Sequence, residues 1–289
     1  MIDSIEMSVL AIDGGGTRCR IAYSDGKAIT SVETGSANVS TDFDGSVREI
    51  LSGIDALSAK LEAQLNDQPT FVGLAGVTGP QIADRLRAAL PFRKIRIEDD
   101  RPAALRGALG DRNGVVAHCG TGSFFGSRID GQTRLFGGWG PALGDEASAQ
   151  WISRLALSAT LQAVDGRAHM SAMAETFIER FGGVPGLVQF AGVASPKDFG
   201  ALAPLVTEMA HDGDRLAIQV LQAGADEIAR SLPLIGWTPG LAICLTGGIG
   251  PHFASYLPNE MRAEVVLPKG EPLVGALALA LELAEETAR

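Results

Sequence analysis

The sequence has few cysteines, aromatic residues and basic residues, and each shortage disfavours a class of protein. Its three cysteines, Cys19, Cys119 and Cys244, lie far apart with no CxxC pair. We therefore expect no disulfide scaffold, and we expect the protein to reside in a reducing compartment. Aromatic residues make up 6% of the chain, too few for base-stacking platforms. With 24 basic and 34 acidic residues the net charge is −10, which disfavours nucleic-acid and anionic-membrane partners.

Long apolar runs and targeting signals are absent as well. The longest uncharged stretch, residues 231–259, contains four prolines and is too interrupted to span a membrane. The N-terminal residues are acidic and do not have the pattern of a signal peptide. Together these observations predict a cytoplasmic protein with no membrane or nucleic-acid partner.

Glycine, in contrast, is abundant: 36 of 289 residues, about 12%, against a usual value of about 7%. Two glycine-rich segments have the same order of elements. Residues 9–25 and 115–130 each read as strand, Gly/Thr loop, strand and Asp-Gly turn, with a third strand after the turn. This repetition favours a duplicated domain, although two hairpins in an α/β protein can also look alike by chance.

The rest of the chain alternates strands and helices, which predicts mixed or parallel sheets covered by helices. Asp44 is placed to cap the helix that follows it. The further elements that we expect are strands over 71–75, 93–98 and 241–246, and helices over 82–90, 146–166, 214–232 and 272–288. A tight domain boundary is expected near residues 107–113.

Three glycine loops could approach a ligand closely. The first, Gly14-Gly15-Gly16-Thr17, lies between two strands, so it is not a dinucleotide-binding fingerprint, and the chain contains no P-loop motif. Its backbone N–H groups could cradle phosphate, and Asp13 beside it could hold Mg²⁺ directly or through water. The equivalent loop of the second hairpin is Gly120-Thr121-Gly122-Ser123, and Gly247-Gly248 forms a third turn. Ordinary tight turns are the alternative.

Two acidic segments could carry the remaining chemistry. Glu98-Asp99-Asp100 ends a strand and opens a helix, so one carboxylate could cap the helix and another could accept a proton from a substrate hydroxyl. The loop Gly137–Glu146 offers an aromatic face and carboxylates, a combination suited to a sugar, with helix capping by Asp145 as the alternative.

Jointly, these motifs resemble the acetate and sugar kinase/heat-shock protein/actin superfamily and, within it, the BadF/BadG/BcrA/BcrD ATPase family. The segments that carry the resemblance are DGGGTRCR (13–20), GSAN (35–38), CGTGS (119–123), GGWGPALGDEASAQWI (137–152), LTGGI (245–249) and PLVGALALA (272–280). The resemblance implies two duplicated actin-like (ribonuclease H-like) domains, residues 1–109 and 110–289, with a nucleotide cleft between them. It also implies that the last helix, about 272–288, packs back toward the N-terminal domain.

The same resemblance implies roles for individual residues. Asp100 would be the catalytic base, with Asp99 left open as the alternative, and Asp13 would serve Mg²⁺. ATP would contact the first loop (Gly14, Gly15, Gly16, Thr17), the second loop (Gly120, Thr121, Gly122, Ser123) and the turn Gly247-Gly248. The sugar would contact Asn38, Asp100, Gly138, Trp139, Asp145 and Glu146.

The activity implied is that of an ATP-dependent amino-sugar kinase acting on the 6-hydroxyl of glucosamine or N-acetylglucosamine, with glucosamine slightly favoured. The alternatives are a kinase for another hexose derivative, such as N-acetylmuramic acid, and an ATPase that activates a redox enzyme. The activators bind an iron–sulfur cluster between subunits through cysteines, and no suitable cysteine pair is present here. Ala147 replaces the usual glycine of GDEGS, a change expected to be tolerated. A homodimer is compatible with these expectations.

Overall fold

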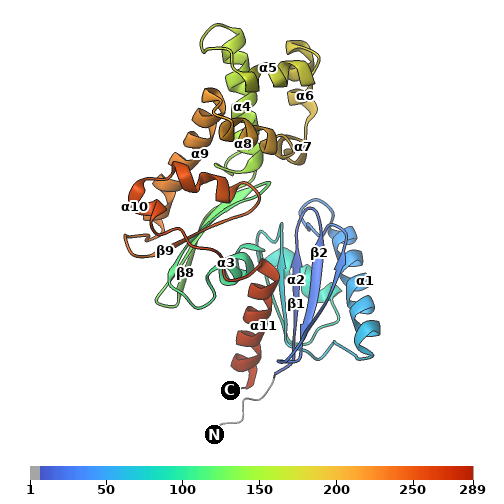
Figure 1. Ribbon diagram of the computed structural model, residues 1–289. Coiled ribbons are helices and arrows are strands. Elements are labelled where there is room, and N and C mark those ends of the chain that lie inside the picture. The colour runs from blue at the N-terminus through green and yellow to red at the C-terminus, as the bar shows by residue number, and fades with distance from the viewer. Residues whose placement is uncertain (1–6, 289) are drawn as a thin grey trace. The chain divides into compact units, whose positions relative to one another are not determined.

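The computed structural model describes residues 7–288, which divide into two units (Figure 1). Unit 1 contains the residues up to Asp111 together with those from Lys269 onward, and unit 2 is Arg112–Pro268. The chain therefore leaves unit 1 once and returns to it. Each unit is built on one β-sheet with helices packed against it, and the predicted α/β class is confirmed.

Unit 1 has a five-stranded sheet in the order β3-β2-β1-β4-β5. The first three strands are antiparallel, whereas β4 runs parallel to β1 and β5 runs parallel to β4. Its elements are β1 (Val9–Gly14), β2 (Cys19–Ser24), β3 (Ile29–Thr34), α1 (Phe43–Leu61), β4 (Thr70–Leu74), α2 (Pro80–Ala89), β5 (Ile95–Glu98), α3 (Arg101–Leu109) and α11 (Pro272–Ala288).

Alternation along β1 sends side chains to two separate cores. Leu10 and Ile12 pack with α1 and α2 on one face of the sheet. Val9 and Ala11 pack with α3 and α11 on the other face, where α11 lies beside β1 (Figure 1). Because side chains two residues apart share a face, Asp13 lies on the α3/α11 face at the carboxyl end of β1.

Unit 2 has a four-stranded sheet in the order β8-β7-β6-β9, and most of its helices follow β8. Its elements are β6 (Gly114–Cys119), β7 (Ser123–Ile129), β8 (Gln132–Gly137), α4 (Ala149–Val164), α5 (Ala172–Arg180), α6 (Val184–Val193), α7 (Pro196–Gly200), α8 (Ala203–His211), α9 (Arg215–Leu234), β9 (Ala242–Thr246), the 3₁₀ helix η1 (Gly250–Tyr256) and α10 (Asn259–Arg262).

The two sheets share one arrangement, three antiparallel strands followed by a strand parallel to the first, as the duplicated hairpins predict. The hairpin turns differ in length. Asp130 and Gly131 form a two-residue turn with φ of 50° and 77°, the left-handed values that such a turn needs. In unit 1, Ser24 pairs with Ile29, so four residues separate β2 from β3.

Two helix starts differ from the sequence-based expectation. Asp42, not Asp44, caps α1, because its extended backbone lets its side chain accept a hydrogen bond from the Gly45 N–H at 2.8 Å. Helix α4 begins at Ala149, not at Glu146. Ser148 caps it, and Asp145 and Ala147 have φ of 59° and 63°, which a right-handed helix excludes.

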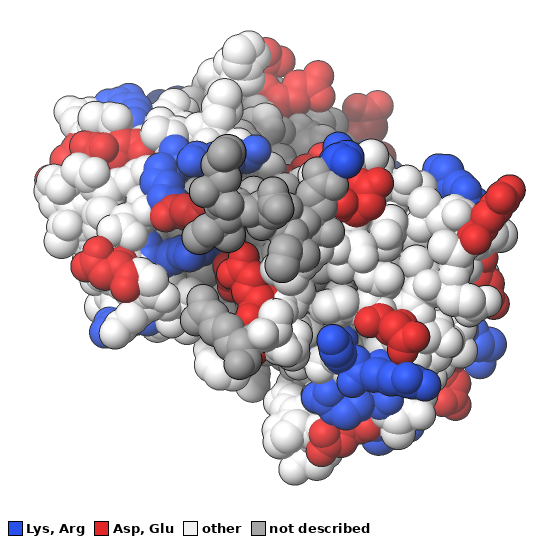
Figure 2. Space-filling model, turned by 90° about the horizontal axis from the view of Figure 1, so that it is seen from below, with Lys and Arg blue, Asp and Glu red and all other residues white. Residues whose placement is uncertain are grey.

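Charged side chains of both signs are interspersed on the face shown in Figure 2, where acidic residues lie beside basic ones. Within residues 7–288, no helix combines the length and apolarity required to cross a lipid bilayer.

Candidate active site

The first glycine loop joins β1 to β2 through a tight turn that the Gly15 N–H closes by donating to the Arg18 carbonyl at 3.0 Å. A Cβ at Gly14 would crowd its neighbours, since it would lie 2.4 Å from Leu74 Cδ2 and 3.0 Å from Ala37 Cβ. At Gly15 and Gly16 a Cβ would meet nothing within 4 Å, and neither residue has a left-handed φ. The fold itself does not demand glycine at these two positions, so they fit close approach by a ligand.

The segment Gly35–Asn38 docks against this loop. The Ala37 N–H donates to the Gly15 carbonyl at 2.9 Å, and the Val39 N–H donates to the Ala75 carbonyl at 3.1 Å. Asn38 Oδ1 accepts hydrogen bonds from the backbone and hydroxyl of Ser40. Unit 1 therefore brings Asn38 beside the glycine loop with its amide oxygen already used, and its Nδ2 is the group left to donate to a ligand.

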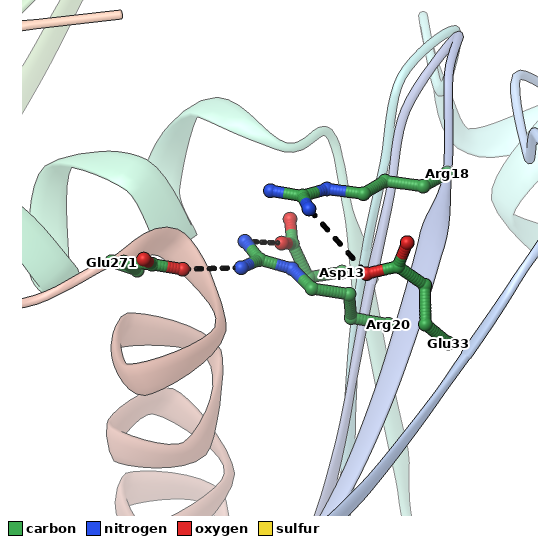
Figure 3. A network of polar contacts seen from close by, with 5 residues as sticks. All are labelled: Asp13, Arg18, Arg20, Glu33 and Glu271. Atoms are coloured by element: carbon green, nitrogen blue, oxygen red, sulfur yellow. Dashed lines mark hydrogen bonds and ion pairs between the residues drawn. The ribbon is translucent and has the colours of Figure 1, made fainter.

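Asp13 is held by an arginine from the neighbouring strand (Figure 3). Arg20 Nη2 lies 2.7 Å from Asp13 Oδ2, and the side chains are 14% and 13% exposed. Arg20 Nη1 donates to Glu271, at the entry to α11. Burial raises the pKa of Asp13 above its ordinary value, and the hydrogen bond from Arg20 opposes that rise.

The neighbouring acids Asp99 and Asp100 have different environments. Asp99 accepts hydrogen bonds from the backbone and the guanidinium of Arg101 at 2.8–2.9 Å. Asp100 stands at the N-cap position of α3, yet its side chain makes no capping hydrogen bond. Burial, followed by the negative charge of Asp99, raises the pKa of Asp100 to about 6. The Asp99 carboxylate is thus bound by Arg101, whereas the Asp100 carboxyl does not cap its helix.

In unit 2, the second glycine loop is tied to the loop that precedes α4. The Gly120 carbonyl accepts from the Ala149 N–H at 2.8 Å, and the Ser123 hydroxyl donates to the Glu146 carbonyl at 2.5 Å. A Cβ at Gly122 would lie 2.8 Å from Asp145 Oδ2, so the carboxylate covers this glycine closely. Three residues of the predicted phosphate loop, Gly120, Gly122 and Ser123, therefore lie against the segment that contains Asp145 and Glu146.

The Gly137–Glu146 loop combines buried and exposed side chains. Asp145 is 7% exposed and accepts from the Gly140 N–H at 3.1 Å, and burial raises its pKa. Trp139 is 75% exposed, and Gly138 has a φ of 75° that suits glycine. Glu146 is half-buried. The aromatic face and the carboxylate oxygens of this loop can thus meet a polar ligand.

The third glycine turn follows β9 beside the end of β6. Gly247 has a φ of 80°, and a Cβ there would lie 2.2 Å from the Cys119 carbonyl oxygen, so packing requires glycine. At Gly248 a Cβ would meet nothing within 4 Å. His118 Nδ1 lies 3.0 Å from Thr246 Oγ1, which links the two strand ends, and burial lowers the pKa of this imidazole to about 4.

Unit 1 thus gathers Asp13, the first glycine loop, Asn38 and Asp100, and unit 2 gathers the other predicted residues. Arg20 and Arg101 were not among the sequence-based candidates. For Arg20 a signal existed: a two-residue turn at Gly16-Thr17 places Arg20 directly opposite Asp13 in the hairpin. For Glu271, 251 residues from its partner Arg20, the sequence offers no such signal.

Several known proteins are similar to this chain over nearly its whole length. Glucosamine kinase GspK of Vibrio cholerae is 27% identical over 279 residues, which cover 94% of this chain and 95% of that protein. An N-acetylmuramic acid/N-acetylglucosamine kinase of Clostridium acetobutylicum is 27% identical over 302 residues, covering 94% and 97%. A crystal structure from Chromobacterium violaceum, provisionally described as an N-acetylglucosamine kinase, is 30% identical with a TM-score of 0.83, covering 95% and 99%. The family model matches residues 10–280, and the chain belongs to the BadF/BadG/BcrA/BcrD ATPase family.

Proposed function

We propose that the protein is an ATP-dependent amino-sugar kinase that transfers the γ-phosphoryl group of ATP to the 6-hydroxyl of its substrate. The family is one of ATPases, and the similar proteins bear the names of glucosamine, N-acetylglucosamine and N-acetylmuramic acid kinases. Asp100 carries the proposal, because its side chain makes no hydrogen bond that caps α3 and its pKa is raised to about 6, with the charge of Asp13, beside the first glycine loop, among the causes. Such a carboxyl is what phosphoryl transfer to a hydroxyl requires.

In this mechanism Asp100 orients the acceptor hydroxyl and takes its proton as the phosphoryl group is transferred. Because the transition state of phosphoryl transfer is loose, the base contributes mainly by positioning. The backbone N–H groups of the glycine loops stabilise the negative charge of the phosphates. The open space beside Gly15, Gly16 and Gly248 is the structural feature that supports this assignment.

Asp13 fits the role of a protein group that serves Mg²⁺. Within residues 7–288, no cluster of three or more His, Cys, Asp or Glu side chains could hold a metal ion by itself. That composition agrees with a cation bound through phosphates and water plus one carboxylate, the usual way in which Mg²⁺ accompanies a nucleotide. Bound there, Mg²⁺ would neutralise charge on the transferring phosphates.

Unit 2 offers an acceptor sugar the face of Trp139 and the carboxylates of Asp145 and Glu146, and unit 1 by itself offers Asn38 Nδ2. Asp145 already accepts a backbone hydrogen bond, so Glu146 is the carboxylate with more capacity to meet a ligand. A free amino sugar carries an ammonium that gains from such a carboxylate, whereas an acetamido group needs an apolar niche. This chemistry favours glucosamine over N-acetylglucosamine, and a site with a specific polar partner can discriminate strongly.

The direct test is ADP release, measured in a coupled assay over glucosamine, N-acetylglucosamine, N-acetylmuramic acid and neutral hexoses, with NMR identification of the phosphorylated position. We expect sugar-dependent turnover, a 6-phosphate product and a higher kcat/KM for glucosamine. A tenfold preference for N-acetylglucosamine that does not change with salt would reverse the choice of substrate. ATP hydrolysis at the same rate without any sugar would contradict kinase function.

The open space at the first glycine loop leads to a prediction on nucleotide binding. Because a Cβ at Gly15 or Gly16 would meet nothing within 4 Å among the described residues, the double change Gly15→Ala/Gly16→Ala should leave the midpoint of thermal unfolding within about 2 °C. The affinity of this variant for an ATP analogue, measured by calorimetry, should fall by at least about tenfold, in line with the roughly 1–3 kcal/mol that overpacking a site costs. The control is Gly14→Ala, which should destabilise the fold, because its Cβ would overlap Leu74. Unchanged nucleotide affinity in the double variant would contradict the phosphate role of the loop.

The raised pKa of Asp100 leads to a prediction on the pH dependence of turnover. A carboxyl with a pKa of about 6 is increasingly protonated as the pH falls through 6, and a protonated base cannot accept the hydroxyl proton. We therefore expect kcat to fall on the acid side with a midpoint near pH 6, where ordinary aspartates remain ionised. The measurement is kcat between pH 5 and 8 at saturating substrates, and a flat profile down to pH 5 would contradict the assignment.

A further inference from the structure

Asp13 and Arg20 form a pair fixed by the register of the hairpin. They are direct partners across β1 and β2, so their side chains emerge on the same face of the sheet. Nη2 of Arg20 lies 2.7 Å from Oδ2 of Asp13, and both side chains are largely buried. Figure 3 shows the guanidinium between two carboxylates, that of Asp13 and that of Glu271.

The backbone at Glu271 is held in place by close packing, although the Glu271 side chain is 72% exposed. A Cβ at Gly107 of α3 would lie 2.3 Å from the Glu271 carbonyl oxygen, which shows how closely the two segments pack. At Gly275, in the first turn of α11, a Cβ would lie 2.0 Å from the Ala103 carbonyl oxygen. The entry to α11 is therefore held against α3, and Glu271 can anchor the outer nitrogen of Arg20.

The second arginine of the hairpin has a different environment. Arg18 Nη1 lies 3.4 Å from Glu33 Oε2, and both of these side chains are 55% exposed (Figure 3). An exposed pair of this kind contributes roughly 0–1 kcal/mol. Arg20 instead uses the two arms of a planar, rigid guanidinium on two carboxylates, a geometry that lysine cannot reproduce. Arg20 binds Oδ2 of Asp13, which leaves Oδ1 for another ligand.

We infer that Arg20 is a positioning residue for Asp13: held by Glu271, it orients the Asp13 carboxylate so that Oδ1 faces the Mg²⁺ that accompanies the nucleotide. The inference rests on the nucleotide site of the proposed function. Partners that orient a metal-binding carboxylate change metal affinity by roughly 10–100-fold when they are lost. Arg20 should therefore act on the Mg²⁺ dependence of nucleotide binding rather than on nucleotide binding as such.

The test uses Arg20→Lys, which retains the positive charge and removes the two-armed contact. Calorimetry measures the affinity for a non-hydrolysable ATP analogue over a series of Mg²⁺ concentrations and in EDTA. We expect the Mg²⁺ concentration for half-maximal tightening to rise by about 10–100-fold. In EDTA the affinity should stay within about threefold of wild type, since the charge is unchanged. Glu271→Gln, which still accepts from Arg20, should have a smaller effect than Glu271→Ala.

Arg96→Lys is the matched control. Arg96 also lies on a strand of unit 1 and also pairs with an exposed glutamate of α11, Glu286, but not with Asp13. The Arg96→Lys change should leave the Mg²⁺ dependence of nucleotide-analogue binding unchanged. An equal shift in both arginine variants would assign Arg20 a general structural role and overturn the inference. A wild-type or lowered Mg²⁺ requirement in Arg20→Lys would also overturn it, the latter because it would mean that Arg20 competes with the cation. Absence of any analogue binding by the wild-type protein would contradict the proposed function itself.

Discussion

Replacing Asp100 by asparagine is expected to lower kcat by about 10²–10⁴-fold, with much smaller effects on nucleotide binding. Asparagine retains the size of the side chain and its place before α3 but cannot accept a proton. Burial raises the pKa of Asp100, which means that the folded protein disfavours its ionised form. A neutral amide removes that unfavourable term at neutral pH, so the variant should unfold at the same temperature as wild type or slightly higher. A loss of activity could then not be attributed to misfolding.

Asp99→Asn is the matched control for this experiment. Its carboxylate binds Arg101 through the backbone N–H and two guanidinium nitrogens, so the change should affect stability more than kcat. The two variants are read together, by steady-state kinetics and by thermal unfolding. If Asp99→Asn is the crippling change and Asp100→Asn is nearly silent, the base is Asp99 and the assignment made here is wrong.

The sequence was sufficient to predict the sheets, because their signals are local. Apolar runs that end in glycine loops and Asp-Gly turns fix where a strand ends, and the repetition of the pattern at residues 9–25 and 115–130 predicted the two similar sheets. The errors lie at element ends. Asp42 and Asp44 are both good capping residues. Asp42 caps the helix because its backbone is extended, a property that composition does not reveal.

The charged neighbours of the candidate site could be predicted only in part. The acids at positions 99 and 100 are equivalent in sequence, and the guanidinium of Arg101, which folds back on Asp99, distinguishes them. Arg20 could be found from the hairpin register, whereas Glu271 reaches it from the far end of the chain. The position of Ala147 shows a further limit: its φ of 63° is a left-handed value that glycine adopts more readily than alanine, and no local sequence pattern predicts it.

Asp13→Ala is expected to abolish Mg²⁺-dependent turnover, a loss of at least about 10³-fold, because a cation at the transferring phosphates supplies several kcal/mol of charge stabilisation. Alanine also removes one partner of Arg20, whose side chain is only 14% exposed. The remaining bond from Arg20 to Glu271 keeps the guanidinium paired, so the protein should still fold, at a lower unfolding temperature.

Asp13→Asn separates the chemical role of this carboxylate from its structural one. The amide oxygen can still accept from Arg20, so the unfolding temperature should recover toward wild type, whereas the charge that serves the cation is gone. Turnover should therefore remain low in Asp13→Asn although stability returns. Both variants are measured over a Mg²⁺ series, by coupled ADP release and by thermal unfolding. If either variant retained wild-type activity with an unchanged Mg²⁺ requirement, Asp13 would have no part in serving the cation, because a neutral side chain at this position cannot replace the charge of a carboxylate.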